Sequence, residues 1–294
     1  MTTPSINDTP VIVGCGFLGK YLAKLLCNSH KIPLCIIQSR QSYDHLSSEG
    51  FDTRLFDLDD VGKPLGFQLE NREIYYLAPP SRTDLCDHRM DYFLSLCALN
   101  PPKKIVYIST SGVYGDCQGE WVDETRPMAP ISQRATRRVY AENALTRFCN
   151  RQPTDYLILR VGGIYGPERL PVQRLRDITV ICPDEAPYSN RIHVADLAHV
   201  CQIAMNSQYR NDVFNVADGH ATTMTDFYYK LADFSGQPRP PCVPMSQASE
   251  KLSAGMLSFI RESRRLSIRK LQTQLKVSIQ FPDLTSGLKN CFNK

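Results

Sequence analysis

The sequence has no apolar run that approaches the length of a membrane span, and no dense run of lysine and arginine. A helix that crosses a bilayer needs about 20 consecutive apolar residues, so we expect no membrane segment. A net charge of +4 over 294 residues is only mildly basic and gives little support to nucleic-acid binding.

Cysteine is frequent, but it lacks the spacing of metal sites and disulfide frameworks. The eleven cysteines are an odd number and no two follow the C-x-x-C pattern, so we expect neither a metal site nor a disulfide network. The stretch MTTPSINDTP also lacks the basic and apolar regions of a signal peptide. So many unpaired thiols fit a reducing compartment, which leads us to expect a cytoplasmic protein.

Short apolar runs alternate with helical spacings through the first half of the chain. We predict six strands, at residues 11–13, 34–37, 53–56, 74–77, 105–108 and 156–159. Apolar residues recur at helical spacing after residue 16 and over 92–99, and the basic run SQRATRRVYAENAL at 132–145 also resembles a helix. This alternation predicts an α/β fold with a doubly wound parallel sheet and right-handed crossovers.

The first strand leads into VIVGCGFLGK, which carries Gly14, Gly16 and Gly19 as G-x-G-x-x-G. The motif alone is a weak signal, but here it follows a strand and opens a helix, as a dinucleotide site requires. The first glycine allows the tight turn, the second lets the backbone approach the pyrophosphate, and the third lets helix and strand pack closely. A glycine-rich turn without a ligand is the weaker alternative.

The end of the second strand usually selects the cofactor, because an acidic residue there binds the ribose hydroxyl of NAD. The sequence IIQSRQS has no carboxylate. Ser39 can donate a hydrogen bond, and Arg40 can pair with the 2′-phosphate of NADP. We therefore expect NADP to be preferred over NAD, unless Arg40 is only an exposed loop charge.

Beyond Gly166 the chain changes character, since proline and arginine become frequent and strands are harder to place. Here we predict one strand and two helices, at residues 213–216, 224–232 and 263–275. We expect a dinucleotide-binding Rossmann domain over residues 1–166. Residues 167–294 would form a smaller substrate lobe, with some segments near 190–217 returning to the sheet.

Several motifs occur in an order typical of one family: LFDLDD, YYLAPP, YISTSGVYGD, LILRVGGIYGP and NRIHVADLA. Over nearly its whole length the chain resembles the extended short-chain dehydrogenases/reductases, the superfamily of NAD-dependent epimerases and dehydratases. The particular residues of these motifs resemble those of an atypical, YeeZ-like subgroup. The resemblance implies an NAD(P)-binding Rossmann fold and an oxidoreductase or epimerase that acts on a small molecule, as a monomer or a homodimer.

The resemblance also assigns residues to the cofactor. Phe17 and Leu18 belong to its glycine-rich loop, and Asp57-Leu58 resembles the pair that contacts adenine. Ala78 and Pro79 would lie in the turn after the fourth strand, beside the cofactor.

On the substrate side, the resemblance places Thr110 at the catalytic Ser/Thr position, where its hydroxyl would bond a substrate oxygen. Tyr114 and Tyr165 follow in motifs of the substrate-side loops, and Arg191 and His193 resemble residues that close the substrate cleft. Thr110 could also simply bond its own backbone at the strand end. His193 could equally be a hydrogen-bonded structural histidine.

The family's catalytic helix carries Tyr-x-x-x-Lys and then a glutamate four residues later. If Glu142 is that glutamate, Arg138 stands at the lysine position and Arg134 at the tyrosine position. Tyr140 faces a different side of the helix from position 134, so we expect a packing role for it. The conventional acid is therefore missing, since a guanidinium stays protonated.

Two functions remain open. The first is an oxidoreductase or epimerase in which Arg134 and Arg138 bind an anion, an oxyanion or the nicotinamide ribose. Its acid/base could then be Tyr114, Tyr165, Asp123 or Glu120. The last two lie in the loop GEWVDE, which could cover the substrate or could equally be an ordinary surface loop. The second is a dinucleotide-binding redox sensor without turnover. The retained substrate-side motifs favour the first.

Overall fold

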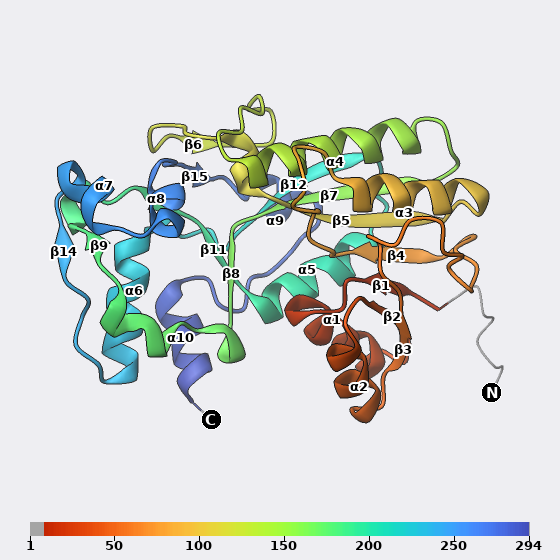
Figure 1. Cartoon of the computed structure of the whole chain (residues 1–294), viewed down its shortest axis with the longest axis horizontal. Coiled ribbons are helices and arrows are strands. Elements are labelled where there is room, and N and C mark those ends of the chain that lie inside the picture. Colours follow the sequence, from red (N-terminus) through yellow and green to blue (C-terminus); the bar gives the residue numbers. More distant parts are fainter. Residues whose placement is uncertain (1–8, 294) are drawn as a thin grey trace. The chain divides into compact units, whose positions relative to one another are not determined.

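The computed structural model describes residues 9–293, which divide into two compact units (Figure 1). Unit 1 contains residues 9–110, 133–160 and 197–214. Unit 2 contains residues 111–132, 161–196 and 215–293. The chain therefore passes between the units several times.

The main sheet has seven strands in the order β12-β7-β5-β4-β1-β2-β3. Their bounds are β1 Val11–Val13, β2 Leu34–Ile37, β3 Asp52–Leu55, β4 Glu73–Tyr76, β5 Lys104–Thr110, β7 Asp155–Val161 and β12 Asp212–Val216. β1 and β2 are buried along their whole length, which explains their continuous apolar sequence. The parallel α/β sheet expected from the sequence is confirmed.

Helices cover both faces of this sheet. They are α1 Phe17–Asn28, α2 Arg40–Ser48, α3 His88–Leu99, α4 Gln133–Cys149 and α5 Val194–Asn206. In Figure 1, α3 and α4 lie together on one face, and α1 lies on the other. The rings of Tyr76, Phe93 and Tyr107 pack in the core beneath α3 and α4. α3 ends at Leu99, before the two prolines Pro101 and Pro102.

The strand order reverses at β1, which pairs with β2 on one side and β4 on the other. The chain therefore leaves β1 and β4 in opposite directions at the carboxyl edge of the sheet. Ligands of open α/β sheets bind at such a switch point, which directs attention to the loops after β1, β2 and β4.

Unit 2 is built from short paired strands and helices. The pairs are β6 Trp121–Val122 with β15 Arg265–Leu266, β8 Gly163–Tyr165 with β11 Arg191–His193, β9 Val180–Ile181 with β14 Cys242–Val243, and β10 Tyr188–Ser189 with β13 Thr222–Thr223. The helices are α6 Met224–Ser235, α7 Ala248–Lys251, α8 Ala254–Ile260, α9 Arg269–Gln274 and α10 Leu284–Phe292. Apolar side chains of α6 and α10 form its main core.

The helix predicted over residues 263–275 is wrong in its first half. Only Arg269–Gln274 is helical, and Arg265–Leu266 forms strand β15 beside β6. The backbone N–H of Arg265 donates to the carbonyl of Glu120 at 2.9 Å, so distant pairing overrides the local helical pattern.

Candidate functional site

The loop after β1 has the geometry that its glycines suggest. Gly14 has φ +87°, and a Cβ there would come within 2.6 Å of the backbone nitrogen of Ala78. A Cβ on Gly19 would meet the sulfur of Cys15 at 3.1 Å. At Gly16, by contrast, a Cβ would meet nothing within 4 Å, so the space above this residue is open. A phosphate can therefore approach the backbone at the start of α1, whose first turn carries no acidic residue.

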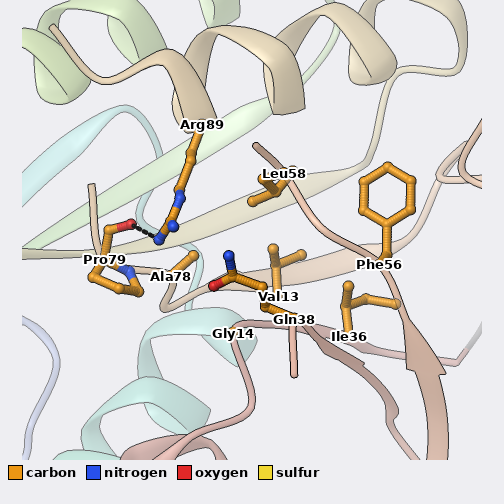
Figure 2. Close-up of a pocket in the computed structure, with 9 residues that line it drawn as sticks. All are labelled: Val13, Gly14, Ile36, Gln38, Phe56, Leu58, Ala78, Pro79 and Arg89. Atoms are coloured by element: carbon orange, nitrogen blue, oxygen red, sulfur yellow. Dashed lines mark hydrogen bonds between the residues drawn. The ribbon is translucent and has the colours of Figure 1, made fainter. Parts of the chain in front are cut away.

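A pocket opens beside this loop in unit 1 (Figure 2). It is lined by Val13, Gly14, Ile36, Gln38, Phe56, Leu58, Ala78, Pro79 and Arg89. The structure thus brings together four residues that the sequence assigned to the cofactor: Gly14, Leu58, Ala78 and Pro79. The apolar lining suits a flat ring system such as adenine.

Sequence reasoning missed the polar members of this pocket, Gln38 and Arg89. Gln38 donates to the carboxylates of Asp57 at 3.0 Å and Asp59 at 3.3 Å. Arg89 donates to Asp59 through Nε at 2.7 Å and to the carbonyl of Pro79 at 3.2 Å. This hydrogen bond to Arg89 lowers the pKa of Asp59, so the pair stays ionised. Gln38 stands where the usual acid ends β2 and was therefore detectable, whereas nothing local marks Arg89.

Ser39 and Arg40 lie at the start of α2. The Ser39 hydroxyl accepts the backbone N–H of Ser42 and so caps the helix. Arg40 is exposed, pairs with Asp44 at 3.0 Å and lies over the ring of Tyr43. Its guanidinium can be reached by a ligand from solvent, although it already shares one carboxylate.

Helix α4 is fixed to the sheet by a buried ion pair. Glu142, 3% exposed, accepts hydrogen bonds from Nε and Nη2 of Arg160 of β7, the shortest at 2.8 Å. The Ser109 hydroxyl of β5 also donates to Glu142, at 2.5 Å. Glu142 therefore sets which side of α4 faces the strand ends.

On that side, Arg138 reaches the carboxyl ends of β4 and β5. Its guanidinium donates to the carbonyl of Ile108 at 2.9 Å, the hydroxyl of Tyr107 at 3.1 Å and the carbonyl of Ala78 at 3.4 Å. Burial acts to lower the pKa of Arg138, but Tyr107 and neighbouring groups raise it overall. Burial also raises the pKa of Tyr107 to about 12, so neither group is a ready acid at neutral pH.

The other candidates near this edge differ in exposure. Thr110 is the last residue of β5 and is partly buried, while Arg134 lies in the first turn of α4 and is exposed. Tyr140 donates to Asp91 of α3 at 2.8 Å and packs against the core. Arg137 bonds the carbonyls of Asp84 and Arg82. Tyr140 thus contacts the neighbouring helix, while Arg138 contacts the strand ends.

In unit 2, the candidate acids of the substrate-side loops are already engaged. The buried Tyr114 donates to the side chain of Asn215 at 2.7 Å. Glu120 pairs with Arg126 at 2.9 Å. Asp123 accepts two hydrogen bonds from Thr125, which lower its pKa. All three groups are therefore already held by hydrogen bonds or an ion pair.

The parallel pair β8 and β11 brings Tyr165 opposite His193. His193 is 1% exposed, its ring packs on Phe281 and Tyr165, and burial lowers its pKa. Its Nδ1 accepts the backbone N–H of Ala195, and Nε2 lies 3.7 Å from the sulfur of Cys291. The imidazole is therefore neutral and held by neighbours on both nitrogens.

Three polar atoms in and around Arg191 are buried without a hydrogen-bond partner in the described part of the chain. They are Nε of Arg191 and oxygens of Tyr165 and Asp218. The Arg191 guanidinium lies 3.9 Å from the centre of the Phe227 ring, and burial lowers its pKa to about 10. Burial likewise raises the pKa of Asp218 to about 7. Asp218, which the sequence did not single out, completes a group with unused hydrogen-bonding capacity.

Among residues 9–293, no three histidine, cysteine or carboxylate side chains gather in a way that could hold a metal ion. Within the same residues, no helix combines the length and the hydrophobicity needed to cross a membrane.

Comparison with protein families gives a match over residues 11–217 to the family described as "NAD dependent epimerase/dehydratase family". Among curated proteins, Protein YeeZ of Escherichia coli K12 is 28% identical over 181 residues. That alignment covers 61% of this chain and 59% of YeeZ, so the chain matches about three fifths of the length of this relative.

Solved structures resemble the chain over almost its full length. A conserved protein of unknown function from Silicibacter pomeroyi has 25% identity and a TM-score of 0.80, with 97% of this chain and 98% of that chain covered. MoeE5, solved in complex with UDP-glucose and NAD, has 18% identity and a TM-score of 0.78, with 97% of both chains covered. At 18% identity, the likeness to MoeE5 concerns the fold alone.

Proposed function

The chain belongs to the NAD dependent epimerase/dehydratase family, and from this premise we propose that it is an NAD(P)-binding oxidoreductase or epimerase with an altered catalytic helix. In this proposal Arg134-x-x-x-Arg138 replaces the usual Tyr-x-x-x-Lys. The substrate is an anionic small molecule, with nucleotide sugars as the first class to test, since MoeE5 was solved with one.

The observation that carries this proposal is the position of Arg138. Its guanidinium is bonded to Ala78 and Ile108, at the strand ends where ligands of such sheets bind. Ala78 also lines the pocket beside Gly14. A permanent cation held there can donate to a ribose hydroxyl of the cofactor, as the family's lysine would. It cannot accept or release a proton, so the proton must move through another group.

The group around Arg191 supports an anionic substrate. A cation with a buried, unpartnered Nε gains from an anionic oxygen that reaches it, because such contacts are strong where water is excluded. Asp218 has a pKa of about 7, which suits a group that exchanges protons at neutral pH. We therefore add Asp218 to the candidates for the missing acid/base.

A nicotinamide cofactor would supply hydride to this chemistry, and Gly14 and Gly16 fit its pyrophosphate because the space above Gly16 is open. We propose a preference for NADP(H), since Gln38 replaces the usual acid and Arg40 is exposed. A charge-assisted contact to the 2′-phosphate is worth roughly 1.5–3 kcal/mol. Arg40→Ala should then weaken NADPH binding by about 10–100-fold in calorimetry and leave NADH binding unchanged.

Gly16→Val tests the cofactor site itself, independently of the preference for NADP. The valine finds open space in the folded chain, so stability should persist while access of the pyrophosphate is lost. Equal affinity of the wild type for NADPH and NADH would contradict the proposed preference for NADP. Unchanged NADPH binding by Gly16→Val would contradict the assignment of the cofactor site.

Turnover is tested by following NAD(P)H absorbance and product formation with a panel of nucleotide sugars. Arg134→Ala should weaken binding of the anionic substrate, and Arg138→Ala should weaken binding of the cofactor. Thr110→Val should lower kcat. Asp218→Asn should remove the arm of the pH–rate profile near pH 7 if this carboxyl moves the proton. Tight NAD(P)H binding without turnover of any substrate would favour the second candidate, a dinucleotide sensor that lacks an acid.

A further inference from the structure

Two pairs of cysteine thiols lie in hydrogen-bonding contact within residues 9–293. One is Cys15 with Cys35, both buried beneath the glycine-rich loop of unit 1. The other is Cys182 with Cys242 in unit 2, where Cys182 is partly exposed and Cys242 is exposed. All four are free thiols. The two pairs have the same chemistry but opposite access to solvent.

The contact between Cys182 and Cys242 follows from strand register. β9 and β14 run parallel, with Val180 opposite Cys242 and Ile181 opposite Val243, and they lie side by side in Figure 1. The backbone N–H of Cys182 continues the ladder by donating to the carbonyl of Val243 at 2.9 Å. Because side chains alternate along a strand, Val180 and Cys182 share a face with Cys242. The two thiols therefore meet diagonally across the pair.

The two thiols differ in their surroundings. The hydrogen bond to Cys242, with lesser effects of burial and of Glu185 and Asp184, raises the pKa of Cys182 to about 11. The more exposed sulfur, Cys242, is also the one that a dissolved oxidant meets first.

We propose that Cys182 and Cys242 form a dithiol site that hydroperoxides convert to a reversible disulfide. The Cys242 thiolate attacks the peroxide O–O bond, which gives a sulfenic acid and releases hydroxide. The Cys182 sulfur, losing its proton, then attacks the Cys242 sulfur, so that the S–S bond forms and the S–O bond breaks. In sum, two thiols and one hydrogen peroxide give one disulfide and two waters, and two electrons pass from sulfur to peroxide.

The disulfide would join β9 covalently to β14. It would close the long loop between Cys182 and Cys242, which restricts the unfolded chain and so stabilises the folded state. The first test treats the full chain with hydrogen peroxide, blocks remaining thiols with a maleimide after denaturation, and maps the peptides by mass spectrometry. One linked pair of peptides is expected, holding Cys182 and Cys242, with Cys15 and Cys35 alkylated. The melting temperature should rise on oxidation and return on reduction.

Two variants sharpen the test. Cys182→Ser should leave a sulfenic acid on Cys242 that dimedone traps, with no linked peptide within the molecule. Cys86→Ser, which removes a partly exposed thiol outside both pairs, should still form the Cys182–Cys242 link. Conversion of Cys242 to sulfinic or sulfonic acid without a link would overturn the proposal. So would a link only between two molecules, or oxidation of Cys15 and Cys35 first.

Discussion

Arg160 in unit 1 is buried and Arg191 in unit 2 is half-buried, and the partners of their guanidinium groups differ. Arg160 is 5% exposed and gives Nε and Nη2 to the carboxylate of Glu142. Arg191 keeps an unpartnered buried Nε and packs its face on Phe227. The carboxyl group beside it, Asp218, has a pKa of about 7 and is only partly ionised near neutral pH.

The difference separates a structural arginine from one that is available to a ligand. Satisfied ion pairs fix helices and strands, whereas buried polar atoms without partners cost stability and persist mainly where a function needs them. The Arg160–Glu142 pair sets the rotation of α4 and so the position of Arg138. The group at Arg191 has hydrogen-bonding capacity left over, which we propose is used by an anionic substrate. Four predictions test this contrast.

The largest effect is expected for Arg160→Met, which leaves the carboxylate of Glu142 buried without its cation. Breaking such a pair typically costs about 3–5 kcal/mol, which urea denaturation followed by circular dichroism would measure. The double variant with Glu142→Gln should recover part of this loss. A loss below about 1 kcal/mol would mean that the pair does not hold α4.

The second prediction concerns Asp218→Asn and pH. Burial raises the folded-state pKa of Asp218 from its ordinary value of 3.8 to about 7. The stabilisation from its bound proton is therefore complete below about pH 4 and lost as pH rises through 7. Asparagine does not titrate, so the stability of the variant relative to wild type should rise by about 2–3 kcal/mol between pH 5 and 8. A difference that stays constant with pH would contradict the raised pKa.

Arg191→Met makes the same chemical change as Arg160→Met, in unit 2. The loss of the contact with Phe227, about 0.5–2 kcal/mol, is opposed by relief from burying an unpartnered cation. The unfolding free energy should stay within about 1 kcal/mol of wild type, while binding of an anionic nucleotide sugar should be lost in calorimetry. If Arg191→Met lowered the unfolding free energy as much as Arg160→Met does, both arginines would be structural and the contrast would be wrong.

The smallest effect is expected for Tyr165→Phe, because its buried hydroxyl has no partner within residues 9–293. Its matched control is Tyr140→Phe, which removes a hydrogen bond to Asp91 and should cost about 0.5–1.5 kcal/mol. Denaturation of both variants should give a change near zero for Tyr165 and a measurable loss for Tyr140. The reverse order would mean that Tyr165 makes a contact that stabilises the fold.

Local sequence patterns were enough to predict much of the fold. The strands Val11–Val13 and Leu34–Ile37 match their predicted bounds, because buried parallel strands are continuous apolar runs between turn residues. The helix predicted over 263–275 failed, since β15 depends on a partner far away in the chain. Local periodicity shows what a segment prefers, but it cannot show what it will meet.

For the candidate site, the sequence by itself predicted the glycine-rich loop, because its motif follows a strand and opens a helix. The family resemblance added Leu58, Ala78 and Pro79, which line one pocket with Gly14. Only the tertiary structure decided that Gln38 and Arg89 line that pocket, and that Arg138 reaches the strand ends while Tyr140 contacts α3. It also decided that Asp218 is buried near Arg191. The burial of a side chain and its hydrogen-bond partners depend on contacts between segments far apart in the chain, so no local pattern encodes them.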